Sequence, residues 1–203
     1  MTDQFTIGVI AYPQAADLDE FRPLERVPGL RLVRATSRAE LQDAECIVLP
    51  GSCRTSADLA WLRAQGLDSA VALHAQARRP VLGVGAGLQM LGEALIDPGD
   101  IAGNGPGLGL LPLVTLLDAG GAVVPGRWRF QPVAGHWAPL SGLALHAGEV
   151  RQGRTVQHAG MGAGRAVIEG GIGWQNEQGN VLGLALRGLF EDAAVLQALF
   201  GPF

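Results

Sequence analysis

The sequence predicts an α/β protein with a mainly parallel central sheet and an antiparallel extension. Strands and helices alternate in the first half of the chain, and hairpin-like strand runs fill the second half. With 203 residues and 48% hydrophobic composition, the chain is expected to form a single domain over residues 1–203 with a sizeable core.

Short apolar runs rich in β-branched residues predict the strands of the first half. Residues 5–12 and 45–50 are expected to form buried parallel strands, with a weaker strand at 31–35 between them. A further strand is expected at 80–84, where Pro80 ends the preceding helix.

Amphipathic segments predict two consecutive helices between these strands. They cover residues 56–66 and 67–79. Thr55 and Asp58 offer a capping box at the start, and Gly66 offers a stop between the two helices.

The second half of the chain differs from the first in composition and in its expected elements. A helix is expected over 87–96, and residues 97–112, rich in Gly and Pro, are expected to be loop. Strand-like runs and a closing helix follow, at 113–117, 122–130, 143–150, 165–171, 180–186 and, for the helix, 190–200.

Charge composition excludes several classes of function. The formal net charge is −4, so the chain has no electrostatic footprint for nucleic acid or an anionic membrane. All 15 basic residues are Arg, and a P-loop needs a Lys. Any ATP chemistry is therefore expected to come from another chain.

The segments that direct a protein to a membrane or out of the cell are not evident. The first residues are acidic where a signal peptide is basic, and no apolar run reaches the ~20 residues of a membrane span. Two cysteines, Cys46 and Cys53, do not make a disulfide framework. A cytoplasmic protein is expected.

The stretch "VLGVGAGLQMLG" at 81–92 reads as a turn from a buried strand into a helix. A dinucleotide fingerprint G-x-G-x-x-G accounts for Gly83 and Gly85, but its third glycine position is Leu88. Close packing of a helix on the sheet accounts for Gly83 and Gly87. A third interpretation is a catalytic turn whose nucleophile position is Gly85.

Six segments in order resemble the glutaminase (class I glutamine amidotransferase) domain of the cobyric acid synthase family. The segment 81–92 lines up with that family's nucleophile elbow, G-x-C-x-G-x-Q. The other five are 12–24, 47–71, 97–112, 141–148 and 179–192. The resemblance implies a flavodoxin-like fold with an extended mixed sheet.

The same resemblance implies a mechanism and the residues it needs. A cysteine thiolate attacks the glutamine amide, a histidine moves the proton, and backbone N–H groups of a Pro-Gly-Ser loop hold the oxyanion. Here the cysteine position is Gly85 and the histidine position is Arg187. Glycine cannot attack, and a guanidinium keeps its proton at neutral pH. Neither catalytic residue is therefore expected to be intact.

A ligand pocket is nevertheless expected at the degenerate site. The resemblance assigns to it Gly51, Ser52, Cys53, Gly85, Ala86, Gln89, His146 and Arg187. Cys53 offers an alternative nucleophile, since it follows Gly51 and Ser52 in the oxyanion loop. Arg187 is expected either to pair with a carboxylate or phosphate ligand, or to point to solvent or pair with Glu191.

Metals and cofactors are not expected. Cys46 is assigned to the core, and His74 to the surface or to helix packing. His136 and His158 lie in Gly-rich segments without a carboxylate at ligand spacing, and no cluster has the spacing of a metal site.

Three functions are consistent with these observations. The first is a non-catalytic binding or regulatory subunit of a separate ATP-dependent synthetase or cobalamin-related enzyme. The second is an active amidotransferase that uses Cys53 or residues donated by a partner, and the third is a nucleotide-binding α/β protein.

Overall fold

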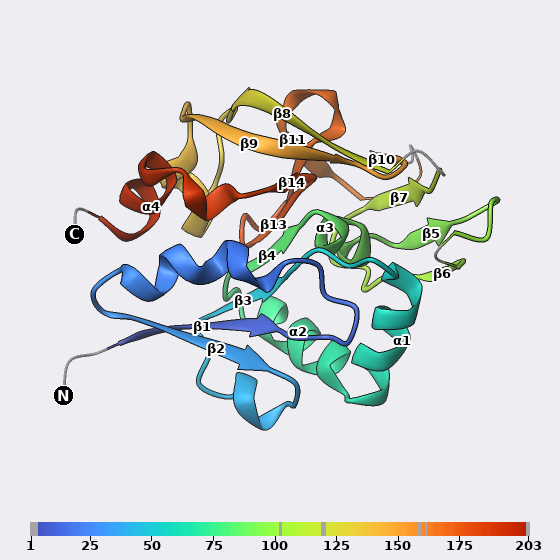
Figure 1. Cartoon of the computed structure of the whole chain (residues 1–203), viewed down its shortest axis with the longest axis horizontal. Coiled ribbons are helices and arrows are strands. Elements are labelled where there is room, and N and C mark those ends of the chain that lie inside the picture. The colour runs from blue at the N-terminus through green and yellow to red at the C-terminus, as the bar shows by residue number, and fades with distance from the viewer. Residues whose placement is uncertain (1–3, 102, 119–120, 158–159, 161, 202–203) are drawn as a thin grey trace.

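A seven-stranded sheet forms the centre of the molecule (Figure 1). The computed structural model describes residues 4–101, 103–118, 121–157, 160 and 162–201. Across the sheet the strands are β11 (Gly164–Ile168), β12 (Gly173–Asn176), β13 (Val181–Leu184), β4 (Val81–Val84), β3 (Cys46–Leu49), β1 (Phe5–Ile10) and β2 (Leu30–Ala35). From β13 to β2 all neighbours are parallel, and β12 and β11 add antiparallel pairs. The expected fold class is confirmed.

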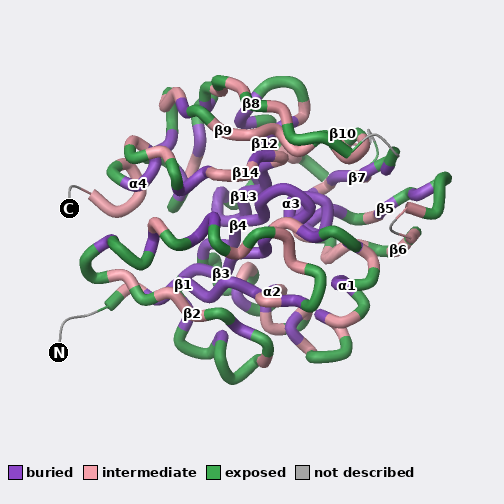
Figure 2. The backbone as a smooth tube through the Cα atoms, in the orientation of Figure 1, coloured by how far each residue is buried: buried purple, intermediate pink, exposed green. Residues whose placement is uncertain are grey.

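The central strands are buried on both faces, which explains their continuous apolar sequences. Buried residues fill the middle of the sheet in Figure 2. On one face Val48 and Leu82 pack with Phe21, and on the other Ile47 packs with Leu62. Successive side chains of one strand thus enter two separate core clusters.

Two helices follow β3, as expected. They are α1 (Thr55–Ala64) and α2 (Leu67–Gln76), separated by Gly66 with a φ of 66°. The predicted capping box is wrong, because α1 has no side-chain cap and the Asp58 carboxylate binds other donors. It accepts hydrogen bonds from Ser52 Oγ at 2.6 Å and from the Gln14 N–H at 3.1 Å.

The helix predicted over 87–96 is shorter than expected, with six residues in place of ten. The helix α3 covers Ala86–Leu91, and a strand, β5 (Ala94–Ile96), takes the rest. Gly92 is extended, and the Glu93 N–H donates to Leu113 O at 2.8 Å. Sheet pairing with a strand distant in sequence therefore overrides the local helical pattern.

Two small sheets make up most of the second half. One has the order β10-β7-β5-β6 and the other β14-β9-β8. Their strands are β6 (Gly105–Pro106), β7 (Leu113–Leu116), β8 (Ala122–Arg129), β9 (Ala144–Arg151), β10 (Arg154–Gln157) and β14 (Leu186–Arg187). The strand predicted at 180–186 is divided, since β13 lies in the central sheet and β14 pairs with β9. That division carries Arg187 away from the central sheet.

Short helices complete the chain. The 3₁₀ helices are η1 (Leu18–Arg26), η2 (Ala39–Leu41), η3 (Gly135–Leu140), η4 (Glu169–Gly171) and η5 (Leu189–Glu191), and the last α-helix is α4 (Ala193–Phe200). The helix α4 is capped by Asp192, which accepts from the Ala194 N–H at 2.9 Å. Among the described residues no helix is both long and apolar enough to cross a membrane.

Candidate functional site

The turn from β4 into α3 holds Gly85 at the carboxyl end of the central strands. Gly85 has φ 55° and ψ −121°, a conformation that favours glycine. Its N–H donates to Leu184 O at 2.8 Å and Leu186 O at 3.1 Å, where the chain passes from β13 to β14. A sharp, buried turn of this kind presents the side chain of its central residue to the space above the sheet.

Close packing explains the glycines on either side of the turn. A Cβ on Gly87 would overlap the carbonyl oxygen of Leu49 on β3. A Cβ on Gly83 would lie 2.6 Å from the carbonyl carbon of Gly87. These two glycines therefore bring α3 against the strands. At Gly85, by contrast, a Cβ would meet Val150 Cγ2 at 3.5 Å, which is an ordinary contact.

The loop after β3 is fixed by the segment that follows β1. Ala16 N–H donates to Gly51 O at 2.8 Å, and Cys53 N–H donates to Gln14 O at 3.0 Å. Ser52 is held by the buried carboxylate of Asp58. Backbone groups of the loop are thus positioned before any ligand arrives.

These elements enclose a cavity of about 330 Å³, called the elbow cavity below. It brings together most of the residues expected in the ligand pocket, namely Gly51, Ser52, Cys53, Gly85, Ala86 and Arg187. The remaining lining residues are Ala16, Asp17, Glu20, Gly121, Ala122, Val123, Val150 and Gln152. Asp17 and Glu20 were not identified from the sequence, although they lie in the segment 12–24 that resembles the family's opening segment.

Two of the expected pocket residues lie outside the elbow cavity. His146 is exposed on β9, where its N–H donates to Asp192 Oδ2 at 3.1 Å. His146 lies on the same face of β9 as Val150 but four residues earlier along the strand, outside the cavity lining. Gln89 is 5% exposed, and its Nε2 donates to Gln152 O at 3.0 Å, so it ties α3 to the hairpin between β9 and β10.

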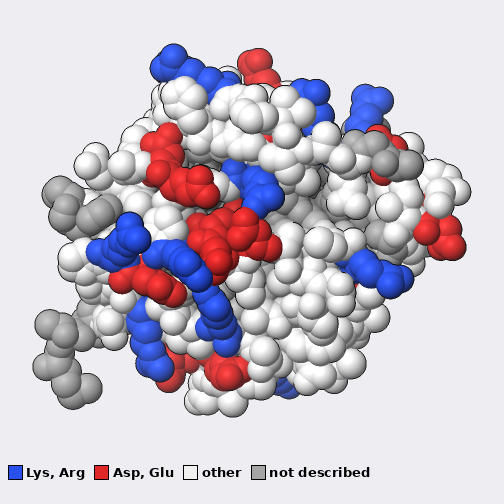
Figure 3. All heavy atoms as spheres, viewed as in Figure 1, with Lys and Arg blue, Asp and Glu red and all other residues white. Residues whose placement is uncertain are grey.

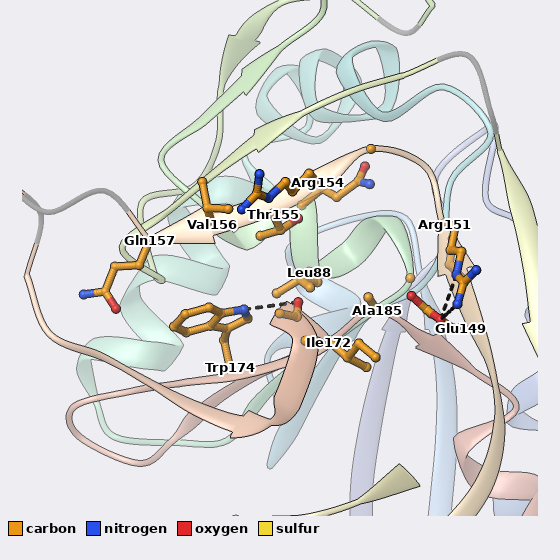
Figure 4. Close-up of a pocket in the computed structure, with 16 residues that line it drawn as sticks. Leu88, Glu149, Arg151, Arg154, Thr155, Val156, Gln157, Ile172, Trp174 and Ala185 are labelled. Carbon is orange, nitrogen blue, oxygen red and sulfur yellow. Dashed lines mark hydrogen bonds and ion pairs between the residues drawn. The ribbon is translucent and has the colours of Figure 1, made fainter. Parts of the chain in front are cut away.

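Gln89 lines a second cavity of about 450 Å³ on the other side of this hairpin. In Figure 4 the Trp174 ring lies at one end and the Glu149–Arg151 ion pair at the other, with Thr155 and Val156 of β10 along the wall. The Trp174 Nε1–H donates to Gly171 O at 3.2 Å. Gly85 and Val150 line both cavities, so the elbow stands between them.

Arg187 is ion-paired with Asp17, not with Glu191 as one interpretation of the sequence predicted. Its Nη2 contacts Asp17 Oδ2. Asp17 has a φ of 35°, an uncommon conformation outside glycine. The division between β13 and β14 points Arg187 across the cavity toward the segment before η1, away from η5. A contact of this sequence separation leaves no local signal.

Glu20 is the most buried charged side chain of the elbow cavity. It is 7% exposed, and its Oε2 accepts from the Gly188 N–H at 2.8 Å. Burial raises the pKa of Glu20 from 4.5 to about 7, although the Gly188 N–H and Arg187 oppose the shift and Asp17 adds to it. The carboxyl group therefore exchanges its proton near neutral pH.

The two cysteines have different surroundings. Cys46 is buried in the core as predicted, and burial raises the pKa of its thiol to about 12. Cys53 is exposed and lines the elbow cavity. The prediction that Cys53 lies near the degenerate site is therefore consistent with the structure.

No imidazole among the described residues lines the elbow cavity. His74 is a packing residue of α2, and its Nε2 lies 3.1 Å from Pro80 O. His136 stacks on Phe5. His158 lies outside the described residues. Within the described ranges, no three His, Cys, Asp or Glu side chains form a group that could hold a metal ion.

The fold is that of the class I glutamine amidotransferases. A solved structure titled "Crystal structure of glutamine amidotransferase" superposes with a TM-score of 0.70 at 19% identity, covering 95% of this chain and 98% of the other. The structure of PurLQS from Thermotoga maritima gives a TM-score of 0.68 at 19% identity, covering 97% of each chain. At this level of identity the likeness establishes the fold alone.

The chain belongs to the CobB/CobQ-like glutamine amidotransferase domain family, whose model matches residues 6–195. It is 57% identical over 199 residues to the cobyric acid synthase of Paracidovorax citrulli (strain AAC00-1), and 58% identical over 198 residues to that of Acidovorax sp. (strain JS42). These matches cover 97% and 96% of this chain. The chain spans about 40% of the length of both relatives.

Proposed function

We propose that this chain is a non-catalytic relative of the cobyric acid synthase glutaminase domain. It acts as a binding or regulatory subunit of a separate ATP-dependent synthetase or cobalamin-related enzyme. One observation carries the proposal. The elbow and its cavity are formed, while the positions that the family resemblance assigns to the nucleophile and the base are Gly85 and Arg187.

The chemistry of these two residues argues against glutamine hydrolysis by the family mechanism. Gly85 offers no nucleophile, and the guanidinium of Arg187, held by Asp17, offers no lone pair to accept a proton. Loss of a nucleophile alone costs on the order of 10⁶-fold in turnover in a comparable triad enzyme. A function that depends on binding does not need either group.

An exposed apolar surface supports association with another protein. The apolar sheet face, defined by Ala94, Ile96, Val114, Leu116 and Val156, lies on one side of β5, β7 and β10. Ile96, Leu116 and Val156 are 46%, 47% and 37% exposed, whereas Leu95 and Leu113 on the opposite side are buried. A sheet face directed to solvent normally carries polar residues.

The basic residues suggest what such a partner supplies. This chain has no Lys with which to build a P-loop. A partner that binds ATP is therefore the expected complement.

Affinity purification from the native host tests the subunit proposal. The expected result is stoichiometric recovery of a P-loop protein with the wild-type chain, and its loss when Leu116→Glu is placed on the apolar sheet face. Leu73→Glu is the matched control, since Leu73 is 57% exposed on α2. Repeated recovery of the wild-type chain alone contradicts the proposal.

Cys53 supports a second candidate, an active amidotransferase with a non-standard nucleophile. Its side chain lines the same cavity as Gly85 and Glu20. Ammonia release from glutamine by the purified protein, alone or with its partner, distinguishes the two candidates. Release that disappears in Cys53→Ala favours the enzyme, and release that persists in that variant points to residues donated by the partner.

A further inference from the structure

When Glu20 is ionised, the charges around the elbow cavity do not balance. Three charged side chains line it, Asp17, Glu20 and Arg187. The guanidinium of Arg187 is taken by Asp17 in an ion pair. Glu20 is a second carboxyl group and has no cation of its own, since no salt bridge involving it is formed among the described residues. Glu191 lies close enough to act on Glu20 with a further negative charge.

Glu20 also has unused hydrogen-bonding capacity. The side chain is 7% exposed and faces the cavity. Its Oε2 accepts from the Gly188 N–H at 2.8 Å, and its Oε1 accepts no hydrogen bond within the described part of the chain. This oxygen is not among the sealed atoms that lack a partner, and Glu20 lines the cavity, so Oε1 is open to accept a hydrogen bond from a ligand there.

The sign of the charge selects the ligand class. A carboxylate or phosphate would have to displace Asp17 from Arg187 and approach Glu20, and both steps are repulsive. Acidic atoms gather beside a basic group in the middle of the face in Figure 3, where η1 approaches β14 in the same view. The excess negative charge instead attracts a cation that donates hydrogen bonds.

We propose that the elbow cavity binds a small primary ammonium group, with Glu20 as the principal acceptor and Asp17 as the second carboxylate. The proposal rests on the proposed function, in which the cavity binds without hydrolysing. The space at Gly85, where a side chain would otherwise stand, is available to the carbon skeleton of the ligand. Ala86, Val123 and Val150 give that skeleton apolar contacts.

Calorimetric titration with methylammonium chloride tests the proposal, with tetramethylammonium, acetate and phosphate compared at the same ionic strength. At pH 8 the Glu20 carboxyl is mostly ionised, because its pKa is about 7. The expected result is saturable binding of methylammonium alone. Equal or tighter binding of acetate or phosphate, or binding of tetramethylammonium as tight as that of methylammonium, overturns the proposal, because tetramethylammonium carries the charge without N–H donors.

Two variants and one control assign the site. Glu20→Gln keeps the shape and the acceptor for Gly188 N–H, and is expected to weaken methylammonium binding at least ~10-fold. Glu25→Gln, an exposed change on the same η1, is expected to leave binding unchanged. Asp17→Asn releases Arg187 and is expected to weaken methylammonium and permit acetate to bind. Equal affinity in Glu20→Gln and Glu25→Gln, both folded by circular dichroism, refutes the assignment.

Measurements on the same samples show whether the ligand class or the proposed function is wrong. If methylammonium does not bind while the P-loop partner is still recovered and no ammonia is released, only the ligand class is wrong. If glutamine is hydrolysed, the non-catalytic function is wrong whatever the titration gives.

Discussion

Arg187 on β14 is ion-paired with Asp17, which lies 170 positions earlier in the chain, just before η1. The pair spans the elbow cavity and joins the opening segment of the protein to the strand at the position that the resemblance assigns to a histidine. Both side chains are accessible, 40% and 48% exposed, so solvent screens the attraction.

Arg187→Met is therefore expected to change stability little. Exposed ion pairs contribute about 0–1 kcal/mol, so the free energy of unfolding should fall by no more than about 1 kcal/mol. Denaturation in urea measures it. A loss above about 2 kcal/mol would mean that the pair is more desolvated than its exposure indicates.

Placing a cysteine and a histidine at the two positions that the resemblance assigns to catalysis is expected to give covalent chemistry. The variant Gly85→Cys/Arg187→His, made with Cys53→Ala so that one pocket thiol remains, should form an adduct with a diazoketone analogue of glutamine. The elbow already has the required turn, and a Cβ at position 85 meets only ordinary contacts. Mass spectrometry detects the adduct.

The matched control is Gly85→Ala/Arg187→His in the same background, which should remain unlabelled. An unmodified thiol at position 85, in a protein that unfolds cooperatively, would indicate that the cavity no longer accepts glutamine.

Glu20→Gln is expected to remove a component of the pH dependence of stability. The folded protein holds the Glu20 proton up to about pH 7, whereas the unfolded chain releases it near 4.5. The contribution of Glu20 to the stability of the fold is therefore complete below pH 4.5. It decreases by roughly 3 kcal/mol as the pH rises to 7. The free energies of unfolding of wild type and Glu20→Gln are measured from pH 4 to 8. The stability of wild type relative to the variant should decrease as the pH rises through that window. A flat difference would contradict the burial of this carboxyl group.

His74→Gln is expected to show the opposite slope. Burial, with a smaller effect of Arg79, lowers the pKa of His74 from 6.5 to about 4. The folded state therefore resists protonation, and its stability is lost as the pH falls from 6.5 to 4. Relative to wild type, His74→Gln should gain stability over that interval. Equilibrium unfolding of both proteins from pH 4 to 7 measures the difference.

Gly87→Ala tests whether α3 packs directly against the backbone of β3. The new Cβ would overlap the Leu49 carbonyl, and moving the strand backbone to relieve the overlap costs stability. A loss of about 3 kcal/mol or more, or failure to fold, is expected. Gly105→Ala should be almost neutral, because nothing lies within 4 Å of its Cβ position. Thermal unfolding compares the two, and similar melting temperatures would refute the contact.

The sequence predicted the central sheet because its strands carry their own signal. Buried parallel strands are continuous apolar runs, and β1, β3, β4 and β13 all read that way. β10 and β12 were missed. Both strands contain polar residues whose partners are distant in sequence, so they lack a continuous apolar run. Thr155 of β10, for example, lies across from Thr115 of β7. The helix predicted at 87–96 failed for the same reason.

The site was predictable where it depends on backbone shape. Gly51, Ser52, Cys53, Gly85 and Ala86 converge, because turns and loops of a doubly covered sheet meet at the strand ends. His146 was misplaced because it lies four residues from Val150 along the same face of β9, outside the cavity lining. Asp17 and Glu20 were missed, since their contacts with residues 187 and 188 are made only when the opening segment folds across the chain.

The glycine at the elbow also affects how this lineage can change. A side chain held at φ 55° and ψ −121° stores about 1–3 kcal/mol of backbone strain, which glycine does not. Native proteins are stable by only about 5–15 kcal/mol, so relief of this size is a sizeable reserve. A chain with such a reserve tolerates further mutations that would unfold a strained homologue. A glycine at this one position therefore widens the range of sequences open to the other positions.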